Sequence, residues 1–178
     1  EVSVPKKVVL KYDFGEDVPD FEGDATQIRQ VIMNLVINAS EAIGDEGGRI
    51  TVSTGMTHVE RSYHHGTLMD SGLPSGDYVF LDVTDNGCGM SVETQAKIFD
   101  PFFTSKDVGK GMGLGLSITH QILQAHKAII EVDSRPTEFT RFRIGEVSRN
   151  RGKAGLIVET DIPVDTHGGT VDAGRNCA

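Results

Sequence analysis

The chain has 178 residues, of which 38% are hydrophobic and 24% are charged. That length suits one domain, and that balance excludes both a disordered segment and a membrane protein. The formal net charge of −9 argues against a general nucleic-acid binder, because neutralising phosphates requires clustered lysines and arginines. No stretch is long and apolar enough for a membrane span, and the opening residues contain no apolar leader. We therefore expect contact with neither nucleic acid nor membrane.

Cysteine and histidine placement gives no sign of a metal cluster. Cys88 and Cys177 lie far apart and form no CxxC pair, which favours a reducing, cytoplasmic compartment. His64 and His65 are adjacent, but no third ligand lies near them in the sequence. Residues 141–153 depart from the acidic average, with five basic residues and one acidic residue (5 − 1 = +4). We interpret this segment as a solvated hairpin.

Hydrophobic periodicity predicts the elements of the first half. Residues 8–14 alternate between apolar and polar and predict a strand. Asp24 suits a helix N-cap, and apolar residues recur at helical spacing from there to Ile43, which predicts a helix of about five turns. Residues 49–57 and 77–84 predict two neighbouring antiparallel strands joined by a long polar loop.

The second half continues the alternation of helices and strands. We expect a short helix over 92–98, an irregular segment, and a second helix from Gly113 to His126. Strands are expected at 128–134 and 140–147, with a further one at 156–162 and a loose Gly-rich tail from Asp165. This order belongs to the α/β class, a two-layer sandwich in which helices cover one face of a mixed sheet.

Two asparagines on the first predicted helix are candidates for chemistry. Asn34 and Asn38 lie one turn apart at the border of the apolar stripe. A half-buried amide oxygen needs a donor or a cation. Either Asn38 ligates a metal ion, Mg²⁺ before others because it prefers hard oxygen ligands, or both amides cap a neighbouring loop.

An acid followed by glycines ends one predicted strand, and more glycines open the second predicted helix. Asp85 precedes Gly87 and Gly89, and a carboxylate at a strand end can accept a hydrogen bond from an amino group of a flat ligand. The segment GKGMGLGLS at 109–117 places glycine amides at a helix N-terminus, where they can bind phosphate. Together with the asparagines, these residues describe a pocket for adenine, metal and phosphate.

Four motifs carry a resemblance to the GHKL ATPase/kinase superfamily. QVIMNLVINASEAI (30–43) resembles its N box, DNGCGM (85–90) its G1 box, IFDPFFTSK (98–106) its F box and GKGMGLGLSI (109–118) its G2 box. The F box and the short lid after it resemble those of sensor histidine kinases. The resemblance covers residues 4–144 and implies a Bergerat-type sandwich with a mostly antiparallel sheet.

The resemblance implies roles for individual residues. Asp85 would receive the adenine amino group of ATP, braced by Thr140 through a water. Asn38, supported by Asn34, would hold Mg²⁺ against the phosphates, and these two would be the catalytic residues. The full set of implied ATP-binding residues is Asn34, Asn38, Asp85, Gly87, Gly89, Lys106, Lys110, Gly111, Met112, Gly113, Leu114, Gly115 and Thr140.

Phenylalanines of the F box would anchor one side of the lid. The resemblance assigns this role to Phe99, Phe102 and Phe103, whereas simple core packing explains Phe99 at least as well.

Some positions depart from the family's pattern. Its ATP-hydrolysing members carry a general-base Glu where this chain has Asn34, and an amide cannot take a proton from water. A lysine common in the N box is replaced by Glu41, which we expect to point to solvent. Thr137 and Phe139 replace glycines in the turn before Thr140, so that turn must differ.

The resulting hypothesis is the catalytic domain of a two-component sensor histidine kinase. It would donate the γ-phosphoryl of Mg·ATP to a histidine on a dimerisation domain absent from this chain, and a response regulator receiver domain would follow. No phosphoacceptor motif precedes the N box, so autophosphorylation of this chain is not expected. The domain would span 1–164, with an added hairpin at 144–164 and a loose tail at 165–178.

Two alternatives remain open at this point. The first is a nucleotide-binding pseudokinase or scaffold module, with the basic hairpin as its interaction face. The second is a serine-directed anti-sigma-type kinase of the same superfamily.

Overall fold

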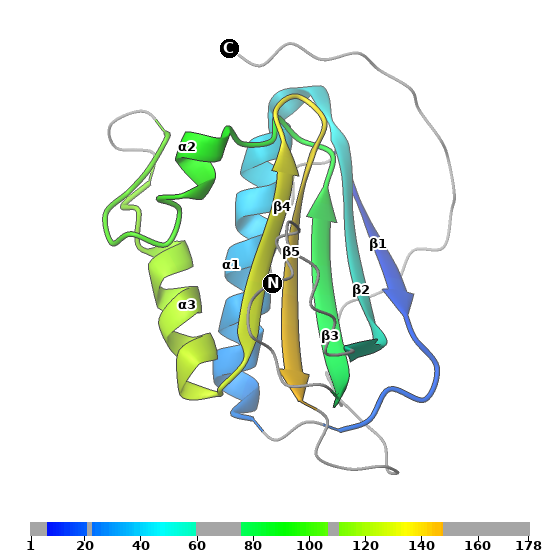
Figure 1. Cartoon of the computed structure of the whole chain (residues 1–178). Helices are drawn as coiled ribbons and strands as arrows, with labels where there is room; N and C mark the ends of the chain where they lie inside the picture. Colours follow the sequence, from blue (N-terminus) through cyan, green and yellow to red (C-terminus); the bar gives the residue numbers. More distant parts are fainter. Residues whose placement is uncertain (1–6, 21–22, 60–75, 107–110, 148–178) are drawn as a thin grey trace.

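Five strands form one mixed sheet in the order β1-β2-β3-β5-β4 (Figure 1). The computed structural model describes residues 7–20, 23–59, 76–106 and 111–147. β1 runs parallel to β2, and every other neighbouring pair is antiparallel, which confirms the mixed, mostly antiparallel sheet. The strands are β1 (Val8–Phe14), β2 (Gly48–Val59), β3 (Gly76–Asp85), β4 (Ile129–Arg135) and β5 (Phe139–Val147).

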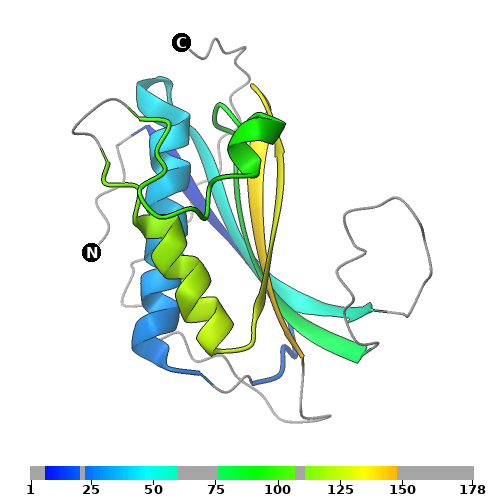
Figure 2. The ribbon, with the colours of Figure 1, turned by 60° about the vertical axis from the view of Figure 1, so that its left-hand side comes forward.

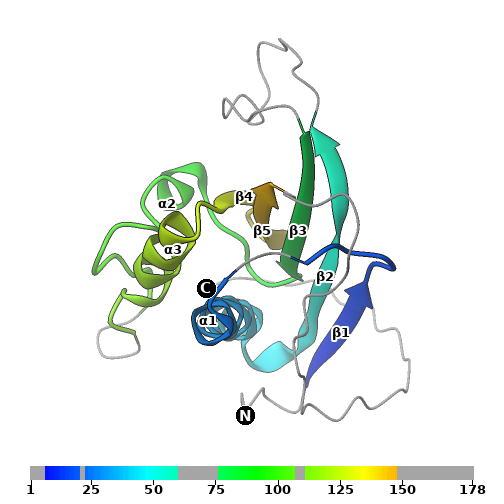
Figure 3. The same cartoon turned by 90° about the horizontal axis from the view of Figure 1, so that it is seen from below.

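Helices cover one face of this sheet. They are α1 (Ala25–Ile43), the one-turn α2 (Val92–Gln95) and α3 (Gly115–Ala125), with a short 3₁₀ turn, η1 (Gly44–Glu46), after α1. Figure 2 shows α1 and α3 as a separate layer beside the sheet, and Figure 3 shows them side by side, with β1 at the far edge. The predicted two-layer α/β sandwich is confirmed. Among the helices of the described ranges, none is long and apolar enough to cross a bilayer.

The first helix begins and ends where its sequence predicts. The Asp24 carboxylate accepts hydrogen bonds from the backbone N–H groups of Thr26 (2.8 Å) and Gln27 (3.1 Å), which satisfies donors that have no partner inside the helix. Gly44 ends the helix with a φ of +67°, a conformation that glycine adopts without steric cost. Between these ends, the buried residues follow the helical period: Ile28, Val31, Leu35, Val36, Ala39, Ser40 and Ile43.

Strand register builds the sheet's contribution to the core. Val52, Val83, Phe142 and Val132 lie opposite one another on four successive strands, β2, β3, β5 and β4. The first three are buried in the core cluster and Val132 packs against it. Because side chains alternate between the faces of a strand, this one row fixes which face receives the helices.

The opposite face of the sheet is held by ion pairs across strands. The Arg143 guanidinium on β5 donates two hydrogen bonds to the Asp82 carboxylate on β3, at 2.8 and 2.6 Å, and lies over the Phe80 ring. These hydrogen bonds raise the pKa of Arg143 above its usual value. Arg141 contacts Asp133 on β4 at 3.1 Å. Bidentate pairs of this kind are stronger and more directional than ordinary surface pairs.

A histidine joins the outer ends of the two long helices. His126, directly after α3, accepts a hydrogen bond at Nε2 from the backbone N–H of Asp24 (3.1 Å), and its Nδ1 lies 2.8 Å from the Ile122 carbonyl oxygen. The contact spans 102 positions in the sequence. It therefore fixes where α3 ends relative to the start of α1.

The structure shortens two predicted helices. The short helix is a single turn, Val92–Gln95, rather than 92–98. The second helix begins at Gly115, two residues later than predicted, because Gly113 has a φ of +64°. The strand expected at 156–162, the hairpin at 144–164 beyond residue 147, the tail at 165–178 and the His64–His65 loop lie outside the described residues.

The core of α1 predicts a large mutational cost at one position. Leu35 is fully buried, so Leu35→Ala should lower the free energy of unfolding by about 2–5 kcal/mol. Ile37 lies on the same helix but is 39% exposed, so Ile37→Ala should cost about 1 kcal/mol or less. Urea unfolding followed by circular dichroism measures both, and equal costs would contradict the assigned helix face.

Candidate functional site

The DNGCG turn begins with a buried carboxylate at the end of β3. Asp85 is 3% exposed and lies opposite Thr140 on β5 and Ile50 on β2. Its Oδ1 accepts a hydrogen bond from the backbone N–H of Gly87 at 2.8 Å. This bond orients the carboxylate, which can also accept a hydrogen bond from an amino group of a ligand.

Because Gly87 has no side chain, the turn can lie directly against the end of α1. A Cβ on Gly87 would approach the Ala42 carbonyl oxygen to 2.6 Å, closer than Cβ atoms come to other atoms in folded proteins. The next residue, Cys88, donates its backbone N–H to the same oxygen at 3.0 Å. The turn is therefore fixed to the last turn of the helix that carries Asn34 and Asn38.

Gly89 joins the turn to the β4–β5 connection. It has a φ of +64°, and a Cβ there would overlap the Arg135 carbonyl oxygen. Thr137 donates its backbone N–H to the Cys88 carbonyl oxygen at 2.6 Å. Thr137 itself has a φ of +66°, an uncommon conformation for a residue with a side chain. The turn thus keeps a left-handed position without the family's glycine, which is how it differs.

Polar side chains continue from Asp85 across the sheet. Thr140 lies 2.9 Å from the Ser134 hydroxyl on β4, and that hydroxyl accepts a hydrogen bond from the backbone N–H of Met90 at 2.9 Å. Gln95 donates to the carbonyl oxygens of Met90 and Ser134, both at 3.0 Å. These hydrogen bonds connect α2 and the turn to the edge strand β4, and through Ser134 to its neighbour β5. Gln95 was not predicted, because its partners are 5 and 39 positions away and nothing local marks them.

Asn34 of α1 contacts the start of α3. Asn34 donates from Nδ2 to the Gly115 carbonyl oxygen (3.2 Å) and to Thr119 Oγ1 (3.3 Å), and Thr119 is fully buried. Asn38, one turn further along, is half-buried. Asn34 therefore holds the two helices together, a role for which the helix alone offered no signal, while Asn38 presents an amide on the same face.

Backbone contacts join the F box to the start of the G2 box. Phe102 donates its N–H to the Gly113 carbonyl oxygen at 2.9 Å, and a Cβ on Gly113 would lie 2.5 Å from the Phe103 carbonyl oxygen. Phe99 and Phe103 pack against the core, and Phe99 stacks on His120 with a centroid distance of 5.0 Å.

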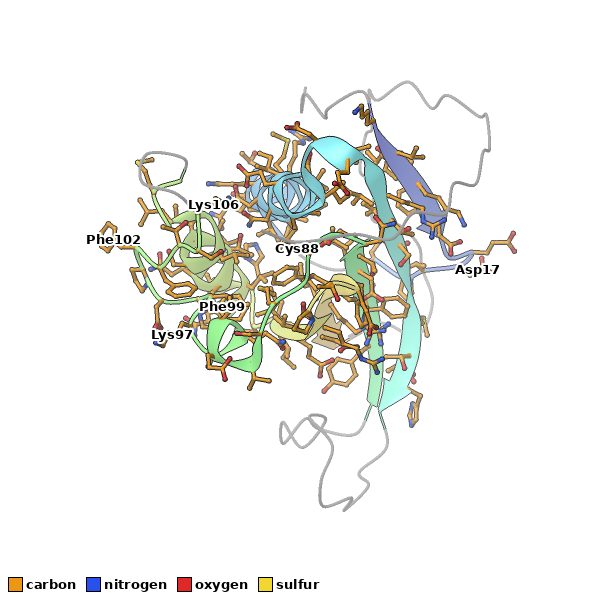
Figure 4. All side chains as sticks on the ribbon, turned by 90° about the horizontal axis from the view of Figure 1, so that it is seen from above. Asp17, Cys88, Lys97, Phe99, Phe102 and Lys106 are labelled. Atoms are coloured by element: carbon orange, nitrogen blue, oxygen red, sulfur yellow. The ribbon has the colours of Figure 1, made fainter. Side chains whose placement is uncertain are left out.

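The Phe102 ring does not anchor the lid as expected. It is 75% exposed and points away from the body of the domain (Figure 4), because the backbone at Phe102 has a φ of +67°. Phe102 therefore contacts Gly113 of the G2 box through its backbone and not through its ring.

Other predicted residues lie along the same segment. Leu114 immediately precedes α3, and its carbonyl oxygen accepts a hydrogen bond from the buried Ser117 hydroxyl at 3.0 Å. Met112 and Gly111 are exposed, and Lys106 forms an ion pair with Glu41 of α1. Lys110 lies outside the described residues. Glu41 is exposed, as expected, and the ion pair with Lys106 is a contact that the sequence did not predict.

The described parts of the chain contain no group of three His, Cys, Asp or Glu side chains that could hold a metal ion. A cation at this site would therefore need further ligands, such as amide oxygens or oxygens of a bound ligand. Half-buried Asn38 offers a hard oxygen of the type that Mg²⁺ prefers, so the residues present fit that ion.

Comparison with protein families identifies the fold and the motifs together. The model for histidine kinase-, DNA gyrase B-, and HSP90-like ATPases matches residues 23–151. This chain belongs to that family, and its fold and motifs are those of the ATP-binding catalytic domain of sensor histidine kinases.

Similar proteins are sensor kinases. The chain is 40% identical over 141 residues to the sensor kinase CckA of Brucella abortus (strain 2308), covering 79% of this chain and 14% of that protein. It is 36% identical over 135 residues to the sensory histidine kinase/phosphatase NtrB of Azospirillum brasilense, covering 73% and 30%. The chain thus spans less than a third of either relative.

A solved structure agrees with this assignment. The nucleotide-free catalytic domain of the histidine kinase ThkA superposes with a TM-score of 0.57 at 27% identity, covering 78% of this chain and 77% of that one. The comparisons favour neither the scaffold nor the anti-sigma-type alternative.

Two glycines with nearly the same φ predict different mutational costs. Gly89→Ala would force a Cβ onto the Arg135 carbonyl, whereas Gly44→Ala, at a φ of +67°, meets nothing within 4 Å. Gly44→Ala should cost only the backbone strain, about 1–2 kcal/mol. Gly89→Ala should cost clearly more in the same urea titration, and equal costs would contradict the close approach.

Proposed function

We propose that this chain binds Mg·ATP with the adenine amino group at Asp85 and the phosphates along α1 toward the N-terminus of α3. The observation that carries the proposal is the buried Asp85 carboxylate at the end of β3, oriented by the Gly87 N–H. A carboxylate can accept several hydrogen bonds, and an adenine amino group is a suitable donor.

The phosphate end of the proposed site lies between α1 and α3. Gly115 begins α3, where unpaired N–H groups and the helix dipole favour an anion. Asn34 fixes this helix end through the Gly115 carbonyl oxygen. Asn38 would hold Mg²⁺, which would neutralise phosphate charge when bound. Lys106, Lys110, Gly111, Met112, Gly113 and Leu114 would complete the contacts, as the resemblance implies.

The proposed reaction is phosphoryl transfer to a histidine on a dimerisation domain that this chain lacks. The bond between the γ phosphorus and its bridging oxygen breaks, a P–N bond to the imidazole forms, ADP leaves, and the imidazole loses its N–H proton. Such transfer relies on positioning and charge stabilisation rather than on covalent help from the protein. A receiver domain of a response regulator would then accept the phosphoryl group on an aspartate.

In this proposal, water competes poorly with the acceptor histidine for the γ-phosphoryl group. The position of the general base in ATP-hydrolysing relatives is held by Asn34, whose amide nitrogen is engaged with Gly115 and Thr119. An amide cannot accept a proton from water near neutral pH, so hydrolysis would lack its base. The cytoplasmic location, the extent of the domain to residue 164 and the role of the segment beyond residue 147 stay predictions.

Nucleotide titration tests the adenine site. Asp85→Asn should weaken ADP binding by roughly ten- to a hundredfold, because a hydrogen bond to a charged group contributes about 1.5–3 kcal/mol. Calorimetry measures this, with Asp133→Asn as the control, since Asp133 is exposed on β4. Unchanged affinity in Asp85→Asn, or no binding by the wild type, would refute the site.

Phosphotransfer tests the reaction. The wild-type chain with radiolabelled ATP should label a separately supplied dimerisation domain of a relative and should not label itself. The label should be lost in acid, as expected of a phosphoramidate, and absent when the acceptor histidine is replaced by alanine. Nucleotide binding without any transfer would favour the scaffold module instead.

A further inference from the structure

Glu41 lies on the same face of α1 as the two asparagines of the candidate site. It follows Asn34 by seven residues and Asn38 by three, which are helical repeats of one face. Its carboxylate pairs with the ammonium group of Lys106 from the end of the F box, 65 positions later. The negative charge of Glu41 therefore lies on the face of α1 along which we propose that the phosphates bind.

Lys106 lies near Thr104 of its own segment and near Gly111. Its backbone N–H donates to Thr104 Oγ1 at 3.1 Å, and a Cβ built on Gly111 would lie 3.2 Å from its Cδ and 3.9 Å from its Nζ. The side chain is 34% exposed. Lys106 thus passes between α1 and the start of the G2 box, with its charge directed at Glu41.

The pair has a direct electrostatic consequence for an anion in this region. A lysine paired with a carboxylate presents little net positive charge to an anion beside it. A partly exposed ion pair contributes little stability, so it can exchange partners readily. A phosphate chain carries more negative charge than one carboxylate and would compete for the ammonium group.

We propose that Glu41 lowers the affinity of this domain for the phosphate end of the nucleotide by neutralising Lys106 in the nucleotide-free chain. Binding then requires Lys106 to exchange the Glu41 carboxylate for phosphate oxygens. This inference rests on the proposed function, because it takes the phosphates to lie along the face of Asn34, Asn38 and Glu41. Glu41 is then a specificity-determining residue, because it weakens the binding of phosphorylated ligands and leaves the binding of adenosine unchanged.

A double-mutant cycle with two ligands tests the proposal. Affinities for ADP and adenosine would be measured by calorimetry at fixed Mg²⁺ for the wild type, Glu41→Gln, Lys106→Met and the double variant. Glu41→Gln should bind ADP about two- to fivefold more tightly, the range that partly exposed ion pairs produce. Lys106→Met should weaken ADP binding by a similar factor. Adenosine affinity should be unchanged in both.

The coupling between the two changes is the decisive measurement. In the Lys106→Met background, Glu41→Gln should lose most of its effect on ADP. Glu46→Gln, an exposed carboxylate just beyond α1, controls for removing one negative charge, and Lys97→Met, an exposed lysine beyond α2, controls for the lysine. Both controls should leave ADP affinity near that of the wild type.

Three outcomes would overturn the inference while leaving the proposed function intact. These are ADP binding that is unchanged or weaker in Glu41→Gln, an equal change for adenosine, or strictly additive effects in the double variant. If the wild-type chain binds neither ADP nor adenosine, the proposed function and this inference both fail. Thermal unfolding of each variant confirms that the fold is retained, since both side chains lie partly in solvent.

Discussion

The rest of the structure depends on how closely the backbone of the DNGCG turn is held by its neighbours. Ala42 at the end of α1 and Arg135 at the end of β4 each place a carbonyl group where a glycine Cβ would be. Hydrogen bonds from Cys88 and to Cys88 fix the same turn from both sides. Because these contacts involve main-chain atoms, they locate Asp85 relative to the helix layer independently of side-chain packing.

The same principle applies at the other end of the candidate site. Gly113 contacts the backbone of Phe102 and Phe103, and Asn34 reaches the carbonyl oxygen of Gly115. The F box and the G2 box thus contact each other through backbone atoms, while Glu41 and Lys106 contact each other through their side chains. This division explains why so many of the motif residues are glycines.

Periodicity and motif order predict the fold well, because burial on one face imposes a regular spacing on α1 and on the strands. They predict single side chains less well. The helical wheel places Glu41 on a face, but its partner lies 65 positions away, so the ion pair could not be foreseen. Phe102 belongs to an apolar motif yet points outward, because contact with Gly113 sets a left-handed backbone there. Such features arise from tertiary contacts rather than from local pattern.

The bridge at His126 fixes the chemical form of its ring. A backbone N–H can only donate, so Nε2 must accept from Asp24 and carry no proton. The hydrogen of the neutral imidazole is then on Nδ1, where it meets the Ile122 carbonyl oxygen. A single tautomer of the neutral ring therefore joins the two helices. The far end of the helix layer is held by one specific arrangement of hydrogen atoms.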